Sequence, residues 1–127
     1  TSHTILKLAE HGNVIIVGRG ANIITTTIPN AFHIRFVAPL SFRIENAMQL
    51  YNVDRKTATD FINEKDESRK KYIWKYFHKN IEDPLLYHTV VNTNLLKFEE
   101  IAEMIGHCVI RRFPEFFTSP FKELVSE

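Results

Sequence analysis

The segment from Asn13 to Asn22 constrains the fold of this chain more than any other. Val14 to Val17 form a continuous run of β-branched apolar residues, which is typical of a strand buried on both faces of a parallel sheet. The run ends in Gly18-Arg19-Gly20, where the glycines permit a tight turn and the close approach of a ligand. Open α/β sheets bind their ligands at the carboxyl ends of the strands. The segment therefore predicts a ligand site that follows a buried strand.

Arg19 is the chemically informative residue of this segment. A planar guanidinium at the carboxyl end of a strand most often meets a phosphate or a carboxylate. Two interpretations stay open, a ligand-binding arginine and a structural ion pair within the chain. A Rossmann-type dinucleotide site is not predicted, because Ile23 stands where the fingerprint G-x-G-x-x-G requires its third glycine.

The other elements follow from the spacing of apolar residues, since helical spacing predicts helices and alternation predicts strands. Expected helices begin near Ser2, Ser41, Asp54 and Phe98, and expected strands cover 14–17, 32–37 and about 88–92. A charged segment, 63–71, separates the helix at Asp54 from an aromatic and basic stretch, 72–79. This order predicts an α/β fold with a parallel sheet, of which three strands are visible.

Composition excludes several classes of protein. The chain has 127 residues, a net charge of +1 and one cysteine, Cys108. Its length suits one domain or part of one, and the near-neutral charge disfavours a nucleic-acid or membrane-surface protein. A single cysteine excludes an internal disulfide, and no apolar run approaches the roughly 18 residues that cross a bilayer, so a cytoplasmic location is expected. The six histidines lack paired metal-ligand spacing, so no metal held by protein ligands alone is expected.

Several short motifs occur in a defined order along the chain. They are Gly18-Arg19-Gly20-Ala21-Asn22, Val37-Ala38-Pro39-Leu40 with Arg43, the charged segment, Asp83-Pro84-x-x-Tyr87, and Val90-Val91-Asn92-Thr93 before the last helix. Together, from about residue 4 to residue 110, they resemble the cytidylate-kinase-like family of P-loop kinases. The resemblance implies a partial parallel, three-layer sheet of the P-loop kinase type, flanked by helices, with a charged helical lid.

The resemblance also implies roles for individual residues. Arg19 would lie near the phosphate of the acceptor nucleotide, and Arg69 would stabilise charge from a mobile lid. Asp66, three positions earlier on the same helical face, would orient Arg69. Such roles suit phosphoryl transfer, which depends on positioning and charge neutralisation more than on a protein nucleophile. The implied assignments are catalytic Arg19 and Arg69; substrate-binding Gly18, Arg19, Gly20, Asn22, Asp66 and Arg69; lid Lys65, Lys70 and Lys71; and a donor-base loop of Asn92, Thr93 and Asn94.

One motif of that family is missing from the sequence. No G-x-x-x-x-G-K-[ST] loop occurs, and in the family this loop lies after the first strand and holds the donor phosphates. ATP and Mg²⁺ are therefore expected to act only in a complete protein with an upstream P-loop, with CMP or a related monophosphate as acceptor. The chain does not begin with Met, so we expect an excised or processed part with little catalysis of its own. Residues 1–110 would be the C-terminal portion of the kinase-like domain, and 111–127 a Phe-rich tail.

Alternative functions remain open at this point. A non-catalytic module of the same ancestry would sense nucleotides, or form a homodimer through an exposed sheet edge or the Phe-rich tail. A binder of single-stranded nucleic acid would stack bases on Tyr72, Trp74 and Tyr76, although the near-neutral charge disfavours it. The lid segment also fits an ordinary surface helix, and Arg43 fits either a phosphate or a carboxylate partner.

Overall fold

The structure, a computed structural model, describes residues 2–117. In chain order its elements are α1 (Ser2–His11), α2 (Ala21–Ile24), β1 (Ile34–Val37), α3 (Leu40–Tyr51), α4 (Arg55–Phe77), the 3-10 turn η1 (Pro84–Leu86), β2 (Thr89–Asn92), α5 (Phe98–Arg112) and the 3-10 turn η2 (Pro114–Phe116). β1 and β2 pair in parallel, with Ile34 opposite Thr89 and Val37 opposite Asn92. The combination of helices with a parallel pair of strands confirms the predicted α/β class. Phe121 and the rest of the predicted tail from residue 118 lie outside the described residues.

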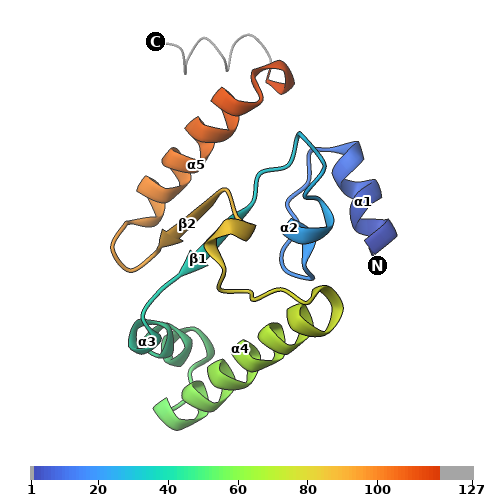
Figure 1. The fold of residues 1–127 in the computed structure, drawn as a ribbon. Helices are drawn as coiled ribbons and strands as arrows, with labels where there is room; N and C mark the ends of the chain where they lie inside the picture. The colour runs from blue at the N-terminus through green and yellow to red at the C-terminus, as the bar shows by residue number, and fades with distance from the viewer. Residues whose placement is uncertain (1, 118–127) are drawn as a thin grey trace.

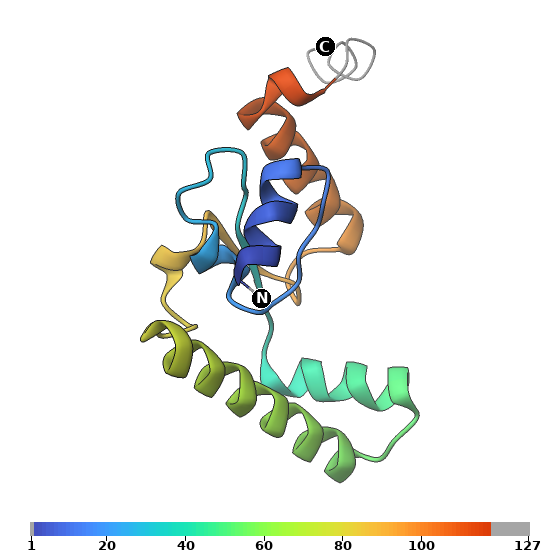
Figure 2. The same ribbon diagram turned by 90° about the vertical axis from the view of Figure 1, so that its right-hand side faces the viewer.

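The elements are arranged around the small sheet. α5 follows β2 and runs back along the sheet, whereas α1 and α2 lie on the opposite side (Figure 1). α3 and α4 form a hairpin that projects beyond the carboxyl end of β1. The perpendicular view also shows the hairpin apart from the sheet (Figure 2). The carboxyl end of β1 therefore leads directly into the hairpin that contains the predicted lid.

The hairpin has a small core of its own. Ile44 and Ala47 of α3 are buried against Ala58 and Ile62 of α4, as expected for two amphipathic helices that share an apolar stripe. Asp54 caps α4, because its side chain accepts a hydrogen bond of 2.9 Å from the backbone N–H of Thr57. The hairpin is thus positioned by its own packing and capping.

The predicted strand at Val14–Val17 is wrong for this structure. These residues have no regular secondary structure, and the exposed fractions of Ile15 and Val17 are 92% and 87%. A β-branched run favours a strand only where a neighbouring strand pairs with it and covers its side chains. The described residues 2–117 supply no such neighbour, because their sheet contains β1 and β2 alone.

Two predicted helix boundaries also need correction. α4 is continuous from Arg55 to Phe77, so the charged segment does not interrupt it; Glu, Lys and Arg are good helix formers, and no glycine or proline breaks the run. Ser41 lies inside α3 and does not cap it, because the backbone C=O of Pro39 already accepts from the N–H of Arg43 at 3.1 Å.

Within residues 2–117, no helix has the length and apolar character to cross a bilayer.

Candidate functional site

The turn Gly18-Arg19-Gly20 adopts a left-handed backbone at three successive residues. Their φ angles are +74°, +60° and +70°, and the N–H of Ala21 closes the turn on the C=O of Gly18 at 3.1 Å. For arginine this conformation costs about 1–2 kcal/mol, because its Cβ crowds the following carbonyl. Strain of this kind tends to persist where function requires a side chain to be presented in one direction.

Arg19 itself is exposed and has no ion-pair partner within residues 2–117. The structural ion pair that the sequence left open is therefore not formed in the described part of the chain. An exposed, unpaired guanidinium on a strained turn has all its donors available to an anion.

Gly20 lies against the last turn of α4. A Cβ at this position would stand 2.3 Å from Cε2 of Phe77, well inside van der Waals contact. Only glycine allows both the positive φ and this close approach. The turn that carries Arg19 is thereby packed directly on the carboxyl end of the predicted lid helix.

Asp66, in the middle of α4, is held by two arginines. Nη2 and Nη1 of Arg43 donate to its two carboxylate oxygens at 2.7 and 2.9 Å, and Nη1 of Arg69 lies 3.4 Å from one of them. The hydrogen bonds from Arg43 keep the pKa of Asp66 below its ordinary value. The expected contact between Asp66 and Arg69 is present, but the shorter, bidentate partner is Arg43, the residue whose partner the sequence left undecided.

Asp66→Asn is expected to lower the free energy of unfolding by about 1 kcal/mol at pH 7. A bidentate arginine–carboxylate pair is among the more stabilising of partly exposed ion pairs. The pKa of Asp66 is depressed in the folded chain, so its stabilising effect is present above the unfolded value, near 3.8, and is lost as the pH falls through the folded pKa. Urea unfolding from pH 7 to pH 2 should show a shallower pH dependence in the variant. Asp60→Asn, which removes an exposed pair with Lys56, is the matched control and should change stability by less than about 0.5 kcal/mol. Equal effects of the two substitutions would contradict a special role for the Arg43 contact.

The remaining residues of the predicted lid face solvent. Arg69 is 61% exposed at its side chain, Lys70 and Lys71 are exposed, and Nζ of Lys65 lies 5.6 Å from the ring centre of Phe61. A cation over an aromatic face is favourable, though weakly so at the surface. Arg69 also contacts Asp66, so Lys70 and Lys71 are the two of these four side chains that have no ion pair or aromatic contact within residues 2–117.

The predicted donor-base loop lies at the carboxyl ends of both strands. The N–H of Thr93 donates to the C=O of Val37 at 2.9 Å, and the side chain of Asn92 accepts from the N–H of Asn94 at 3.0 Å. Asn22 is placed differently, because its amide donates to the C=O of Leu86 at 3.1 Å and ties α2 to η1. Its side chain therefore has a structural contact besides the substrate-binding role predicted for it.

The structure brings some predicted residues together and leaves others apart. Arg43, Asp66 and Arg69 form one network, and Gly20 contacts Phe77. Arg69 lies eight residues before Phe77, about 12 Å of helical rise, and no hydrogen bond or ion pair joins it to Arg19 within residues 2–117. The two predicted catalytic arginines thus belong to separate clusters linked by α4.

Two groups escaped the sequence reasoning. Phe77 is the packing partner that makes Gly20 necessary, and His88 contacts both His33 and Arg112. The residues themselves are evident in the sequence, but no local spacing predicts contacts between residues so distant in the chain. Within residues 2–117, no three His, Cys, Asp or Glu side chains converge as ligands for a metal ion.

Comparisons with known proteins give a consistent family assignment. The profile of a family described as cytidylate kinase-like matches residues 1–95. The chain is similar to a cytidylate kinase of Methanocaldococcus jannaschii, with 26% identity over 106 residues that cover 82% of this chain and 60% of that protein. A cytidylate kinase of Thermoplasma acidophilum is 31% identical over 101 residues, which cover 79% of this chain and 54% of that protein.

Two further matches are to proteins that are not named as cytidylate kinases. A uronate isomerase of Corynebacterium glutamicum is 24% identical over 110 residues, which are 87% of this chain but only 21% of that protein. The crystal structure of an uncharacterized protein from Eubacterium ventriosum superposes with a TM-score of 0.78 at 24% identity, over 85% of this chain and 62% of that one. This last similarity supports the fold. The chain spans between about a fifth and three fifths of the curated relatives named here.

Proposed function

The chain belongs to the cytidylate kinase-like family, and from that premise we propose that it is the acceptor-side and lid portion of a nucleoside-monophosphate kinase. The observation that carries the proposal is Arg19, exposed, without an ion-pair partner in residues 2–117, and presented by a strained left-handed turn. Its ligand would be the phosphate of CMP or a related nucleotide. Arg69 would neutralise charge on the transferring group from α4.

The chemistry assigned to these residues is electrostatic. A monophosphate carries a compact negative charge that a planar guanidinium binds through paired hydrogen bonds. Arg69, Lys70 and Lys71 would approach the same phosphates when the hairpin closes, which excludes water and adds positive charge. Asp66 would act as a positioning residue, because Arg43 fixes its carboxylate and it in turn contacts Arg69.

ATP and Mg²⁺ would supply the phosphoryl group in the complete protein. The described residues do not fit these groups by themselves, because no acidic cluster that could hold a metal ion occurs in 2–117 and the sequence has no G-x-x-x-x-G-K-[ST] loop. We therefore assign donor binding to a part of the protein outside these 127 residues, with the loop Asn92–Asn94 contributing near the donor base.

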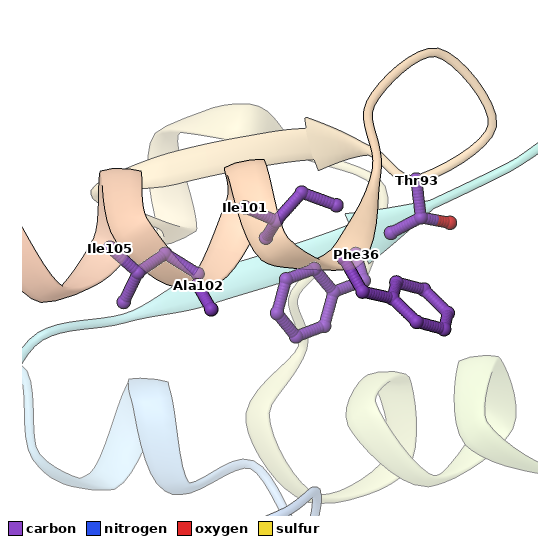
Figure 3. A pocket seen from close by; sticks show the side chains of 6 residues that line it. Phe36, Thr93, Ile101, Ala102 and Ile105 are labelled. Carbon is purple, nitrogen blue, oxygen red and sulfur yellow. The ribbon is translucent and has the colours of Figure 1, made fainter.

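The three-layer arrangement of P-loop kinases is part of the same proposal. An apolar cavity of about 420 Å³ opens between β1 and α5, with Phe36, Ile101 and Ile105 in its wall (Figure 3). The exposed fraction of Phe36 is 57%, and an apolar surface of this kind usually marks a place that another segment covers. A strand from outside these residues, paired with the free edge of β1, would cover it.

Arg19→Ala is expected to weaken CMP binding by about tenfold or more, because a charge-assisted contact to phosphate is lost. Calorimetric titration and thermal shift on the full protein, with CMP, dCMP and other monophosphates, would measure it; a ligand at a hundred times its dissociation constant stabilises by about 2.7 kcal/mol. Arg111→Ala removes another exposed arginine, from the end of α5, and should leave binding within about twofold. No binding by any monophosphate to the full protein, or equal effects of the two substitutions, would contradict the proposal.

The second candidate is a non-catalytic module that senses nucleotides or dimerises. It is favoured by the exposed aromatic side chains of Phe36 and Phe98, which a second copy could also cover. Nucleotide binding by the full protein without phosphoryl transfer in the presence of ATP and Mg²⁺ would favour this candidate.

A further inference from the structure

A second cavity lies near the amino ends of β1 and β2. Its volume is about 420 Å³, and its wall comes from α2, the loop 26–31, η1 and the end of α5. Basic and imidazole groups line it, namely His33, Lys79, His88 and Arg112, whereas none of its described lining residues is acidic. A cavity of this size with a few convergent polar groups is typical of a small-molecule site.

His88 stands at the centre of this group in a defined protonation form. The backbone N–H of His33 donates to Nδ1 of His88 at 2.8 Å, so the neutral ring must carry its proton on Nε2. Nη2 of Arg112 lies only 3.2 Å from that Nε2. An arginine cannot accept a hydrogen bond, so two donors face each other here without an acceptor between them.

The surrounding contacts hold His88 in this orientation. Phe32 stacks on its ring with centres 5.0 Å apart. Thr25 gives its hydroxyl proton to the C=O of Ala21 at 2.6 Å, so it accepts from Nε2–H of His33 at 2.8 Å and fixes that ring as well. The His88 ring is therefore pre-organised, which lowers the entropic cost of binding a ligand there.

The local charge is positive and uncompensated. Within residues 2–117, no carboxylate lies within ion-pair distance of Arg112. Burial, together with the charge of Arg112, lowers the pKa of His88, as expected where positive charge already dominates. A negatively charged acceptor would satisfy both donors and offset this charge.

We propose that this cavity binds a small oxyanion, the phosphate or carboxylate group of a metabolite, between Nε2–H of His88 and the guanidinium of Arg112. Lys79 adds a second positive group, and Ile28 and Leu86 offer an apolar wall for the carbon part of the ligand. Asn22, which the resemblance assigned to the acceptor, also lines this cavity, but the anion-binding groups proposed here, His88 and Arg112, come from the amino end of β2 and the end of α5 and do not include Arg19. It would be a second binding site, and it does not depend on the proposed kinase function.

Histidine-resolved NMR on the full chain tests the proposal directly. Inorganic phosphate and acetate are titrated separately at pH 7.5 and constant ionic strength, with chloride as the balancing ion, while the Cε1–H signals of all six histidines are followed. Saturable shifts at His88 and His33, with His3 and His107 unchanged, are expected. Stronger binding of phosphate would identify a phosphate ester as the ligand class, and stronger binding of acetate a carboxylate.

Two variants make the test specific. Arg112→Gln should weaken the binding about tenfold or more, whereas Arg111→Gln removes the same charge one residue earlier and should change it less than about twofold. Arg19→Ala should leave the His88 shifts intact, so failure of the acceptor site is distinguishable from failure of this one. Absence of a saturable shift, or equal weakening by Arg111→Gln and Arg112→Gln, would overturn the proposal.

Discussion

Gly20→Ala is expected to lower the free energy of unfolding by about 2–4 kcal/mol, because it combines backbone strain with a steric clash. The φ angle of Gly20 is +70°, and a Cβ there would lie 2.3 Å from Cε2 and 2.7 Å from Cζ of Phe77. Real Cβ atoms do not approach this closely, so α4 or the turn must move. The loss should appear in urea unfolding as a lower midpoint with an unchanged slope.

Gly18 and Phe77 provide the controls for this substitution. Gly18→Ala has the same left-handed strain, with φ at +74°, but no atom within 4 Å of the new Cβ, so a loss of only about 1 kcal/mol is expected. Phe77→Leu should relieve the clash, and the double variant should recover about 1 kcal/mol relative to the sum of the single losses. Similar losses at Gly18 and Gly20, with no recovery, would show that Phe77 does not pack on the turn.

Ile62→Ala is expected to lower the free energy of unfolding by about 2–4 kcal/mol, as for other large-to-small changes in a core. Ile62 is 6% exposed and belongs to the cluster with Ile44, Ala47 and Ala58. Because this small cluster holds α3 against α4, little neighbouring material is available to fill the cavity. Hydrogen exchange should show the largest loss of protection in the amides of these two helices.

Ile62→Val tests whether the loss scales with the volume removed. It deletes one methylene, keeps the branched shape, and should cost about 0.5–1.5 kcal/mol. Phe61→Ala removes a larger but 43% exposed side chain from the neighbouring position and should destabilise less than Ile62→Ala. The reverse order would mean that the hairpin is held by its surface and not by this core.

The sequence predicted the end of α3, the start of α4 and the strand β2 because their signals are local. Asp54 is a strong N-cap followed by apolar residues at helical spacing, and Asn52 ends α3 in the left-handed conformation that asparagine tolerates. β2, at Thr89–Asn92, lies within the predicted strand. In each case residues a few positions apart decide the structure.

Features that depend on distant partners were not predictable in the same way. Val14–Val17 has strand propensity, but a strand forms only when another strand pairs with it, and residues 2–117 contain none beside it. Arg43 had several possible anionic partners in the sequence, and only the antiparallel packing of α3 on α4 selects Asp66. His88 and Arg112 meet only because α5 runs back along the sheet.

Because α4 is one continuous helix, a rotation at one of its ends would move the other end as a rigid body. The helix has 23 residues, so it is about 34 Å long at 1.5 Å per residue. Phe77, at the carboxyl end of α4, packs on the turn at Gly20 and is the natural pivot for such a rotation. A tilt of about 10° there moves Arg69 by about 2 Å and the far end by about 6 Å, given the helical rise. Because the turn that carries Arg19 lies against this pivot, such a tilt would move Arg69 relative to Arg19 while the turn itself stays in place.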